Sequence, residues 1–263
     1  MMLYAHHQRA IQRLTEHFQP DPAFTALIIG GSVAKGWAGE NSDVDFMLVA
    51  TADEFARRTA RNELLYFSKD FTDYEGGYVD GKIIDLPFLE EVADHGNEVA
   101  RAAFFSTWAA YSRDPRIDAL IQQIPVYPEA EREAKLQAFY SEVVVGNWFI
   151  GEAMKRRDQY LLTHAASEMA LFGGRLILAY NRILYPYHKW LTHEIARAPE
   201  KPADFMERFQ ALLDAPSATT AQAYTDMLTA YHDWGVSLPE TFVNFTKDRE
   251  WNWRGQRAPL HDW

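Results

Sequence analysis

The chain has 263 residues, enough for one large domain or two of ordinary size. Its 37 Asp and Glu residues outnumber 26 Lys and Arg residues, and the resulting net charge of −11 argues against nonspecific nucleic-acid binding, which needs cationic stripes. Cysteine is absent, so disulfide frameworks, zinc ribbons and thiol nucleophiles are excluded. The N-terminus lacks a secretory signal pattern and no run of about 18 apolar residues occurs, so we expect a cytoplasmic protein without membrane contact.

The first half of the chain mixes predicted helices and strands. In chain order the pattern predicts a helix at 3–18, a strand at 26–29, a short helix at 33–37, a strand at 43–50 and a helix at 52–66. Ser32 is well suited to cap the short helix, because its hydroxyl can accept a hydrogen bond from a free backbone N–H group. Asp80-Gly81 is typical of a two-residue turn, so residues 78–89 are predicted to form a β-hairpin.

The second half of the chain changes character. Residues 103–111 fit either a strand or a helix, and prolines near residue 125 mark a boundary. Beyond it, long helical patterns cover residues 128–156, 158–184, 203–214 and 217–234. We therefore predict an α+β protein in which a small mixed β-sheet domain at residues 1–125 precedes an all-helical bundle domain at residues 126–263.

A glycine turn follows the first predicted strand. Gly31 and Gly36 have the spacing of a Walker A loop, but Trp37 stands where its lysine belongs, so a P-loop is excluded. The Gly31-Ser32 turn at a helix N-terminus still offers backbone N–H groups to a phosphate. A phosphate-binding turn of another kind is therefore expected here.

Three aspartates are candidates for a metal site. Asp43 and Asp45 are two residues apart in a predicted strand, so they project from one face, where they repel each other unless a cation neutralises them. Mg²⁺ prefers a few carboxylates together with phosphate oxygens. Asp85 lies between apolar residues of another predicted strand, where an isolated carboxylate is costly. If the two strands are neighbours, the three carboxylates converge and hold two metal ions.

The string Gly-Gly-Ser-x-Ala-x-Gly-x5-Ser-Asp-x-Asp, followed by a strand aspartate, resembles the polymerase-β-type nucleotidyltransferase superfamily over residues 25–90. With a helical half after it, the chain is similar to the antibiotic (aminoglycoside and lincosamide) nucleotidyltransferase branch. The resemblance implies a catalytic domain at 1–125 and a substrate-binding domain at 126–263. It assigns the residues as follows: Gly31, Ser32 and Ser42 to the nucleotide, Asp43 and Asp45 to two Mg²⁺ ions, and Asp85 to the metal site or to the role of general base.

The resemblance also suggests a cation from the helical half that clamps the triphosphate, either Lys189 or Arg182. The alternatives are a surface lysine and an arginine held in a structural ion pair. Glu152 and Glu168 lie among apolar residues on predicted helices, so either is a candidate general base on the acceptor side. The alternative for both is an ion pair with a nearby arginine, such as Arg156 or Arg175.

These features predict a Mg²⁺-dependent enzyme that moves a nucleoside monophosphate, AMP from ATP or its counterpart from another nucleoside triphosphate, to an acceptor hydroxyl. An acidic helical half suits a polycationic small molecule such as an aminoglycoside-like antibiotic, so a role in antibiotic resistance is expected. Two alternatives stay open. One is an antitoxin-like enzyme that nucleotidylates a protein, and the other is a non-catalytic nucleotide-binding regulatory module.

Overall fold

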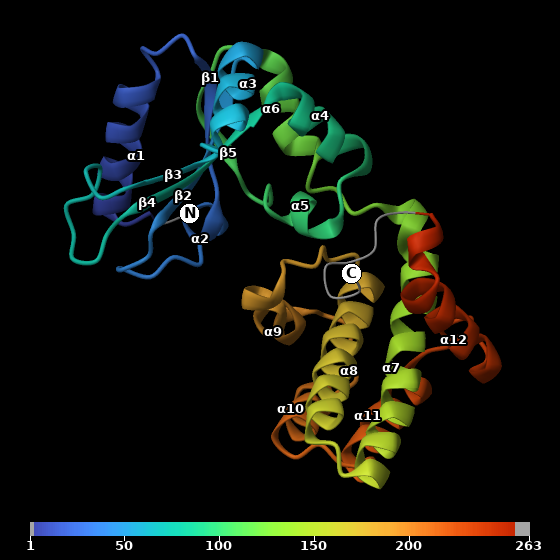
Figure 1. The fold of residues 1–263 in the computed structure, drawn as a ribbon. Helices are drawn as coiled ribbons and strands as arrows, with labels where there is room; N and C mark the ends of the chain where they lie inside the picture. The colour runs from blue at the N-terminus through green and yellow to red at the C-terminus, as the bar shows by residue number, and fades with distance from the viewer. Residues whose placement is uncertain (1–2, 256–263) are drawn as a thin grey trace. The chain divides into compact units, whose positions relative to one another are not determined.

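The computed structural model describes residues 3–255, and the chain divides into two compact units, Met1–Val126 and Tyr127–Trp263 (Figure 1). We call them the first unit and the second unit. The elements of the first unit are α1 (Ala5–Phe18), β1 (Phe24–Ile29), α2 (Gly31–Lys35), β2 (Val44–Ala50), α3 (Ala52–Arg61), β3 (Leu65–Ser68), β4 (Val79–Asp85), α4 (Leu86–His95), α5 (Glu98–Ala102), β5 (Trp108–Ser112) and α6 (Pro115–Gln123). Within the described residues, no helix is both long and apolar enough to cross a membrane.

All five strands belong to one mixed sheet of order β3-β4-β2-β1-β5. The pair β2 and β4 is parallel, and the other neighbours are antiparallel. The parallel register sets Asp45 opposite Asp80 at the start of both strands, and Ala50 opposite Asp85 at their ends. With the helical second unit that follows, this sheet confirms the predicted α+β fold class.

The hairpin predicted at residues 78–89 is wrong, because Asp80 and Gly81 lie inside the single strand β4. Gly81 is required there by packing rather than by a turn, since a Cβ atom at this position would lie 2.3 Å from Cζ of Phe46 on β2. The antiparallel partner of β4 is β3 (Leu65–Ser68), whose first residues the sequence assigned to the end of a helix. The helix actually ends at Arg61, with Asn62 in the left-handed region at its C-cap.

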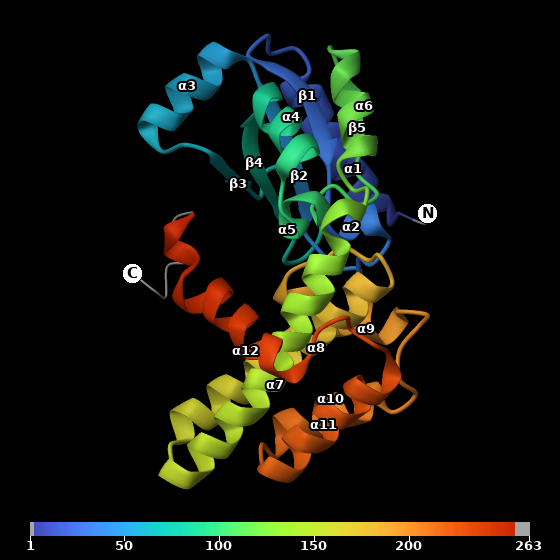
Figure 2. The same ribbon diagram turned by 90° about the vertical axis from the view of Figure 1, so that its right-hand side faces the viewer.

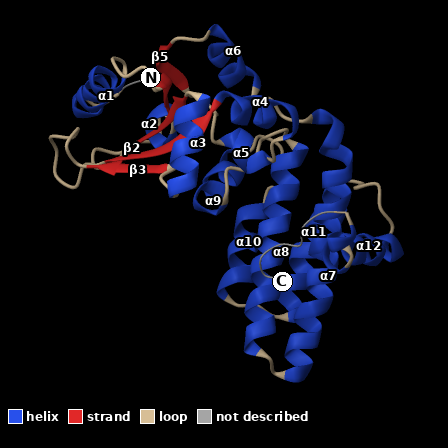
Figure 3. Ribbon diagram, turned by 45° about the horizontal axis from the view of Figure 1, so that its top comes forward, coloured by secondary structure: helices blue, strands red, loops and turns tan. Residues whose placement is uncertain are grey.

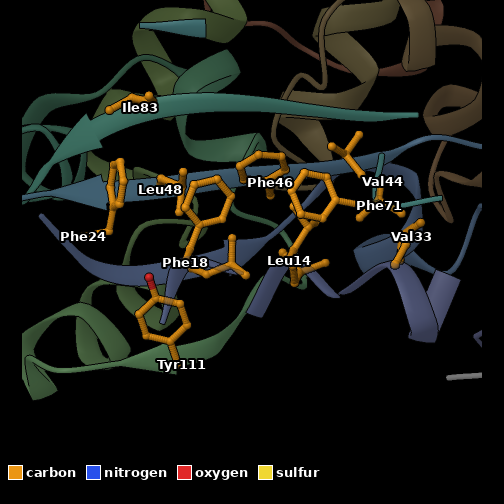
Figure 4. Close-up of a cluster of buried hydrophobic side chains, with 14 of the residues drawn as sticks. Leu14, Phe18, Phe24, Val33, Val44, Phe46, Leu48, Phe71, Ile83 and Tyr111 are labelled. Carbon is orange, nitrogen blue, oxygen red and sulfur yellow. The ribbon is translucent and has the colours of Figure 1, made fainter. Parts of the chain in front are cut away.

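Each face of the sheet packs against its own helices. On one face Leu14 and Phe18 of α1 pack against apolar strand residues such as Phe46. Figure 4 shows the Phe18 and Phe46 rings in one cluster with Phe24 and Phe71. On the other face α4 and α6 contribute residues such as Leu89. In Figure 1, α1 and the α4–α6 pair accordingly lie on opposite sides of the strands. The sheet is thereby buried on both faces along most of its length.

The second unit is helical in the part that the structure describes (Figure 3). Its elements are a 3₁₀ turn (Glu129–Glu131), α7 (Arg132–Arg156), α8 (Gln159–Tyr180), α9 (His188–Arg197), α10 (Phe205–Asp214), α11 (Ala218–Tyr231), α12 (Leu238–Phe245), a π-helical turn (Thr246–Glu250) and a 3₁₀ turn (Asn252–Arg254). The long helices α7 and α8 lie side by side in Figures 1 and 2. Gly146 permits this close approach, because a Cβ atom there would lie 2.4 Å from Cγ of Met169.

Candidate functional site

Three carboxylates meet at the edge of the sheet where β2 and β4 begin. Asp43 immediately precedes β2, Asp45 is its second residue and Asp80 is the second residue of β4. Each side chain offers an oxygen atom, and these atoms lie within 4.8 Å of one another. Asp43 and Asp45 are half-buried whereas Asp80 is exposed. Like charges this close repel one another, so the cluster favours a bound cation.

Asp85 does not belong to this cluster, and the expectation that its carboxylate converges with those of Asp43 and Asp45 is wrong. It lies five residues along β4 from Asp80, a distance of about 16 Å in an extended strand. Its Oδ1 accepts a hydrogen bond of 3.0 Å from the backbone N–H of Phe88, so Asp85 is the N-cap of α4. Capping a helix explains a carboxylate in this apolar stretch without any metal.

Asp80 takes the place that the sequence analysis gave to Asp85. Asp-Gly is a strong turn signal, so the local pattern predicts a hairpin loop at residues 80–81 and does not indicate Asp80 as a metal ligand. The direction of the strand could have revealed it. If β4 runs parallel to β2, the aspartate near the start of β4 lies beside Asp45, whereas an aspartate at its end lies at the opposite edge of the sheet.

The glycine turn packs directly against Asp45. The backbone N–H of Gly30 donates to the carbonyl oxygen of Asp45 over 3.0 Å, which joins the end of β1 to the start of β2. Gly31 has a φ of +62°, and a Cβ atom there would lie 1.7 Å from Oδ2 of Asp45. Only glycine fits both constraints. The N-cap of α2 is Gly30, so the expectation that Ser32 caps this helix is wrong; Ser32 lies within its single turn.

Ser42 shapes the loop that leads into the carboxylates. Its hydroxyl oxygen accepts a hydrogen bond of 3.0 Å from the backbone N–H of Gly39. Its carbonyl oxygen accepts two more, from Nε2 of His7 at 2.9 Å and from the hydroxyl of Tyr74 at 2.6 Å. Burial lowers the pKa of His7, which favours the neutral ring and a donor at Nε2. These contacts fix the backbone immediately before Asp43.

A pocket of about 170 Å³ opens beside the carboxylates. Its lining combines the glycine turn, two carboxylates, two lysines and apolar residues: Gly30, Gly31, Lys35, Asp45, Phe46, Met47, Asp80, Lys82 and Ala103. Asp43 also acts on Tyr78, because its carboxylate charge raises the pKa of the Tyr78 hydroxyl. The pocket is therefore lined by both negatively charged carboxylates and positively charged lysines.

The donor set fits a hard divalent cation. All three groups are carboxylates, and oxygen is the ligand that Mg²⁺ takes in proteins. The pocket beside them leaves room for the additional oxygen ligands that a Mg²⁺ ion keeps, from water or from a phosphate. Lysine ammonium groups along the same pocket suit an anionic ligand rather than a bare metal. The site is thus suited to a metal–phosphate complex.

The candidates in the second unit have structural partners or are exposed. Glu152 pairs with Lys155 at 2.7 Å and with Arg156 at 3.5 Å, as the ion-pair alternative predicted. Arg182 forms an ion pair of 2.8 Å with Glu129, which likewise confirms the structural alternative. Lys189 is exposed on α9, with Nζ 5.9 Å from the centroid of the Trp190 ring.

Glu168 belongs to a half-buried cluster on Arg249. The guanidinium of Arg249, in the π-helical turn, donates to both carboxylate oxygens of Glu142 on α7, at 2.8 and 3.0 Å, and also to Glu168 on α8. The Glu142 side chain is only 8% exposed. Burial raises the pKa of Glu142 even though Arg249 opposes this effect. One arginine thus ties the C-terminal turn to both long helices.

Replacing Arg249 with methionine is expected to lower the free energy of unfolding of the second unit by about 2 kcal/mol, because the buried Glu142 carboxylate then loses its main partner. Urea denaturation followed by circular dichroism measures the change. Arg156→Met is the matched control, since Arg156 is exposed and Glu152 keeps its shorter ion pair with Lys155, so stability should be nearly unchanged. Equal losses in the two variants would contradict a special role for Arg249.

Comparison with known proteins finds a family match within the first unit. Residues 9–98, which contain the glycine turn and Asp43, Asp45 and Asp80, match the family model of the nucleotidyltransferase domain. No curated protein matches the chain. Among solved structures, the chain is similar to a nucleotidyltransferase-like protein from Exiguobacterium sibiricum, with a TM-score of 0.48 and 12% sequence identity over 97% of this chain and 83% of that one. Residues 9–98 are therefore similar to the nucleotidyltransferase domain, and this segment contains all three carboxylates.

Proposed function

We propose that the protein is a Mg²⁺-dependent nucleotidyltransferase that moves AMP from ATP to a hydroxyl group of a small-molecule acceptor. The observation that carries the proposal is the meeting of the Asp43, Asp45 and Asp80 carboxylates beside the glycine turn, in the segment that matches the nucleotidyltransferase domain. In the reaction, the acceptor oxygen forms a bond to the α-phosphorus. The bond from that phosphorus to the bridging oxygen breaks, and pyrophosphate leaves.

The three carboxylates would hold the two Mg²⁺ ions. When bound, the ions supply positive charge that offsets the charge of the phosphates and of the attacking oxygen. Asp80 is the exposed member of the three, so we assign it to the acceptor side, where it can orient the hydroxyl and accept its proton. Asp43 and Asp45 are half-buried, and the Gly30 N–H group holds the backbone of Asp45, which suits a fixed ligand pair.

The pocket beside Asp45 would take the triphosphate. Gly30 and Gly31 let the phosphates approach the backbone closely, and Lys35 and Lys82 line the same pocket with positive charge. Ser32 and Ser42 complete this side, Ser42 by fixing the loop before Asp43. The phosphates would then lie on the β1 side of the carboxylates, where the glycine turn is.

We assign residues 1–125 as the catalytic domain and residues 126–263 as a substrate-binding domain that would add further contacts to the acceptor. The net charge of −11 favours a polycationic acceptor, so we place the enzyme with those that modify aminoglycoside-like antibiotics. Lys189 is exposed and is the one candidate clamp for the triphosphate, among those named from the sequence, that has no ion-pair partner in the described part of the chain. We therefore include in the proposal that the Lys189 ammonium group binds the triphosphate.

The test is to incubate the protein with Mg²⁺, each α-³²P-labelled nucleoside triphosphate and a panel of aminoglycosides and lincosamides. We expect labelled adducts and an equal amount of pyrophosphate with ATP, and no adduct after chelation of the metal with EDTA. Label that appears only on added proteins would instead indicate a protein-modifying enzyme. Binding of a triphosphate without any transfer would indicate a regulatory nucleotide-binding module.

A further inference from the structure

Two aromatic rings flank the carboxylates on the side away from the glycine turn. Phe67 on the edge strand β3 is 64% exposed, and its ring centroid lies 5.2 Å from that of Tyr78, which immediately precedes β4. Phe67 is register-paired with Asp80, so their side chains project from the same face of the sheet. The carbonyl oxygen of Tyr78 accepts a hydrogen bond of 3.2 Å from the backbone N–H of Val44, the residue after Asp43. We call Phe67 and Tyr78 the aromatic pair.

The order of the strands fixes what lies on either side of the metal ligands. Across the sheet the sequence of groups is Phe67 on β3, Asp80 on β4, Asp45 on β2 and the Gly30–Gly31 turn at the end of β1. Neighbouring strands are about 4.8 Å apart. The carboxylates therefore lie between the glycine turn and the aromatic pair. Both the turn and the pair are about one or two strand spacings from the carboxylates.

In a phosphoryl transfer the attacking and leaving oxygens lie roughly in line through the phosphorus atom. If the leaving pyrophosphate points toward the glycine turn, the attacking hydroxyl arrives from the opposite side, over β4 and β3. We propose that the aromatic pair is the platform on which the acceptor rests, and that Phe67 is a positioning residue for the acceptor ring. This inference rests on the proposed nucleotidyl transfer and adds the direction of acceptor entry.

The chemistry of the pair suggests what it holds. A flat, exposed phenyl ring packs well against the C–H face of a sugar or cyclitol ring, since such a face is apolar while its hydroxyl groups point outward around the rim. Amino groups on the same ring would be attracted to Asp80 and to the neighbouring carboxylates. The acceptor class that fits is therefore a hydroxylated, amine-bearing ring, with one hydroxyl directed at the metal ligands.

The experiment measures the binding of two probes separately. Isothermal titration with Mg²⁺ and α,β-methylene-ATP, which cannot transfer AMP, reports the nucleotide site, and kanamycin added to that complex reports the acceptor site. We expect Phe67→Ala to weaken kanamycin binding about tenfold and to leave binding of the nucleotide analogue within about twofold. Phe67→Tyr, which keeps the ring, should bind kanamycin like the unmodified protein.

Phe88→Ala is the matched control, because Phe88 is a partly exposed phenylalanine (37%) beyond the opposite end of β4. It should bind both probes normally, and thermal unfolding should show that all variants are folded. Unchanged kanamycin binding in Phe67→Ala, or no kanamycin binding by the unmodified protein, overturns the platform. Weakened nucleotide binding in Phe67→Ala also overturns it and assigns the ring to the nucleobase. If the unmodified protein does not bind the nucleotide analogue, it is the proposed function that fails.

Discussion

Asp80→Asn is expected to lower kcat/KM for pyrophosphate release about a thousandfold or more, whereas Asp85→Asn should leave it near the level of the unmodified protein. The neutral amide removes one negative charge from the carboxylate cluster, and a thousandfold loss corresponds to about 4 kcal/mol of transition-state stabilisation. A coupled pyrophosphate assay with saturating Mg²⁺, and with an acceptor found in the panel, measures both variants.

Asp85→Asn is a matched control because asparagine is as good an N-cap as aspartate. The side chain at position 85 can therefore still accept the hydrogen bond from the Phe88 N–H group. Asp43→Asn and Asp45→Asn should lose activity like Asp80→Asn and stay folded. Full activity in Asp80→Asn would remove Asp80 from the proposed site. Loss of activity in a folded Asp85→Asn protein would return the third carboxylate to that position.

Gly31→Ala is expected to lower turnover at least about a hundredfold. The methyl group cannot occupy the place that Oδ2 of Asp45 holds, 1.7 Å from the ideal Cβ position, so the carboxylate or the turn must move. The left-handed φ of +62° adds about 1 kcal/mol of backbone strain. Turnover and the midpoint of thermal unfolding, measured together, separate the displaced carboxylate from a general loss of stability.

Gly39→Ala serves as the control for this turn. Gly39 lies in the same glycine-rich segment, an added Cβ atom there meets no atom within 4 Å, and its backbone N–H can still donate to Ser42. We expect it to retain full activity. Equal activity losses in the two variants would mean that the segment as a whole, rather than the contact between Gly31 and Asp45, sets the rate.

Local patterns were sufficient to predict the strands β1 and β2 and the long helices of the second unit. The apolar run before Gly30 and the spacing of Asp43 and Asp45 depend only on neighbouring residues, and both features appear in the structure as expected. The third carboxylate was mispredicted because it depends on strand direction. Whether Asp80 or Asp85 meets Asp45 is decided by the parallel pairing of β2 and β4, which no local pattern in β4 encodes.

Packing between distant segments accounts for the other differences. The local sequence around Gly81 predicts a turn, but the residue is a glycine because the Phe46 ring, 35 positions earlier in the chain, packs against it. The local sequence around Glu168 suggests a general base on an apolar helix, but its partner is Arg249, 81 positions later in the chain. Neither partner could be chosen from the sequence alone, since several aromatic residues and arginines were available to each.

The edge position of β3 has a consequence for how the proposed enzyme could change its preference among acceptors. Leu65 and Phe67 point away from the hydrophobic core and are 75% and 64% exposed, so exchanging them costs little folding energy. Gly81 and Phe46, one and two strands further in, tolerate almost no exchange. A library randomised at 65 and 67 would therefore vary the surface next to the carboxylates while the scaffold stays intact, which makes this strand the natural place to evolve new acceptor selectivity.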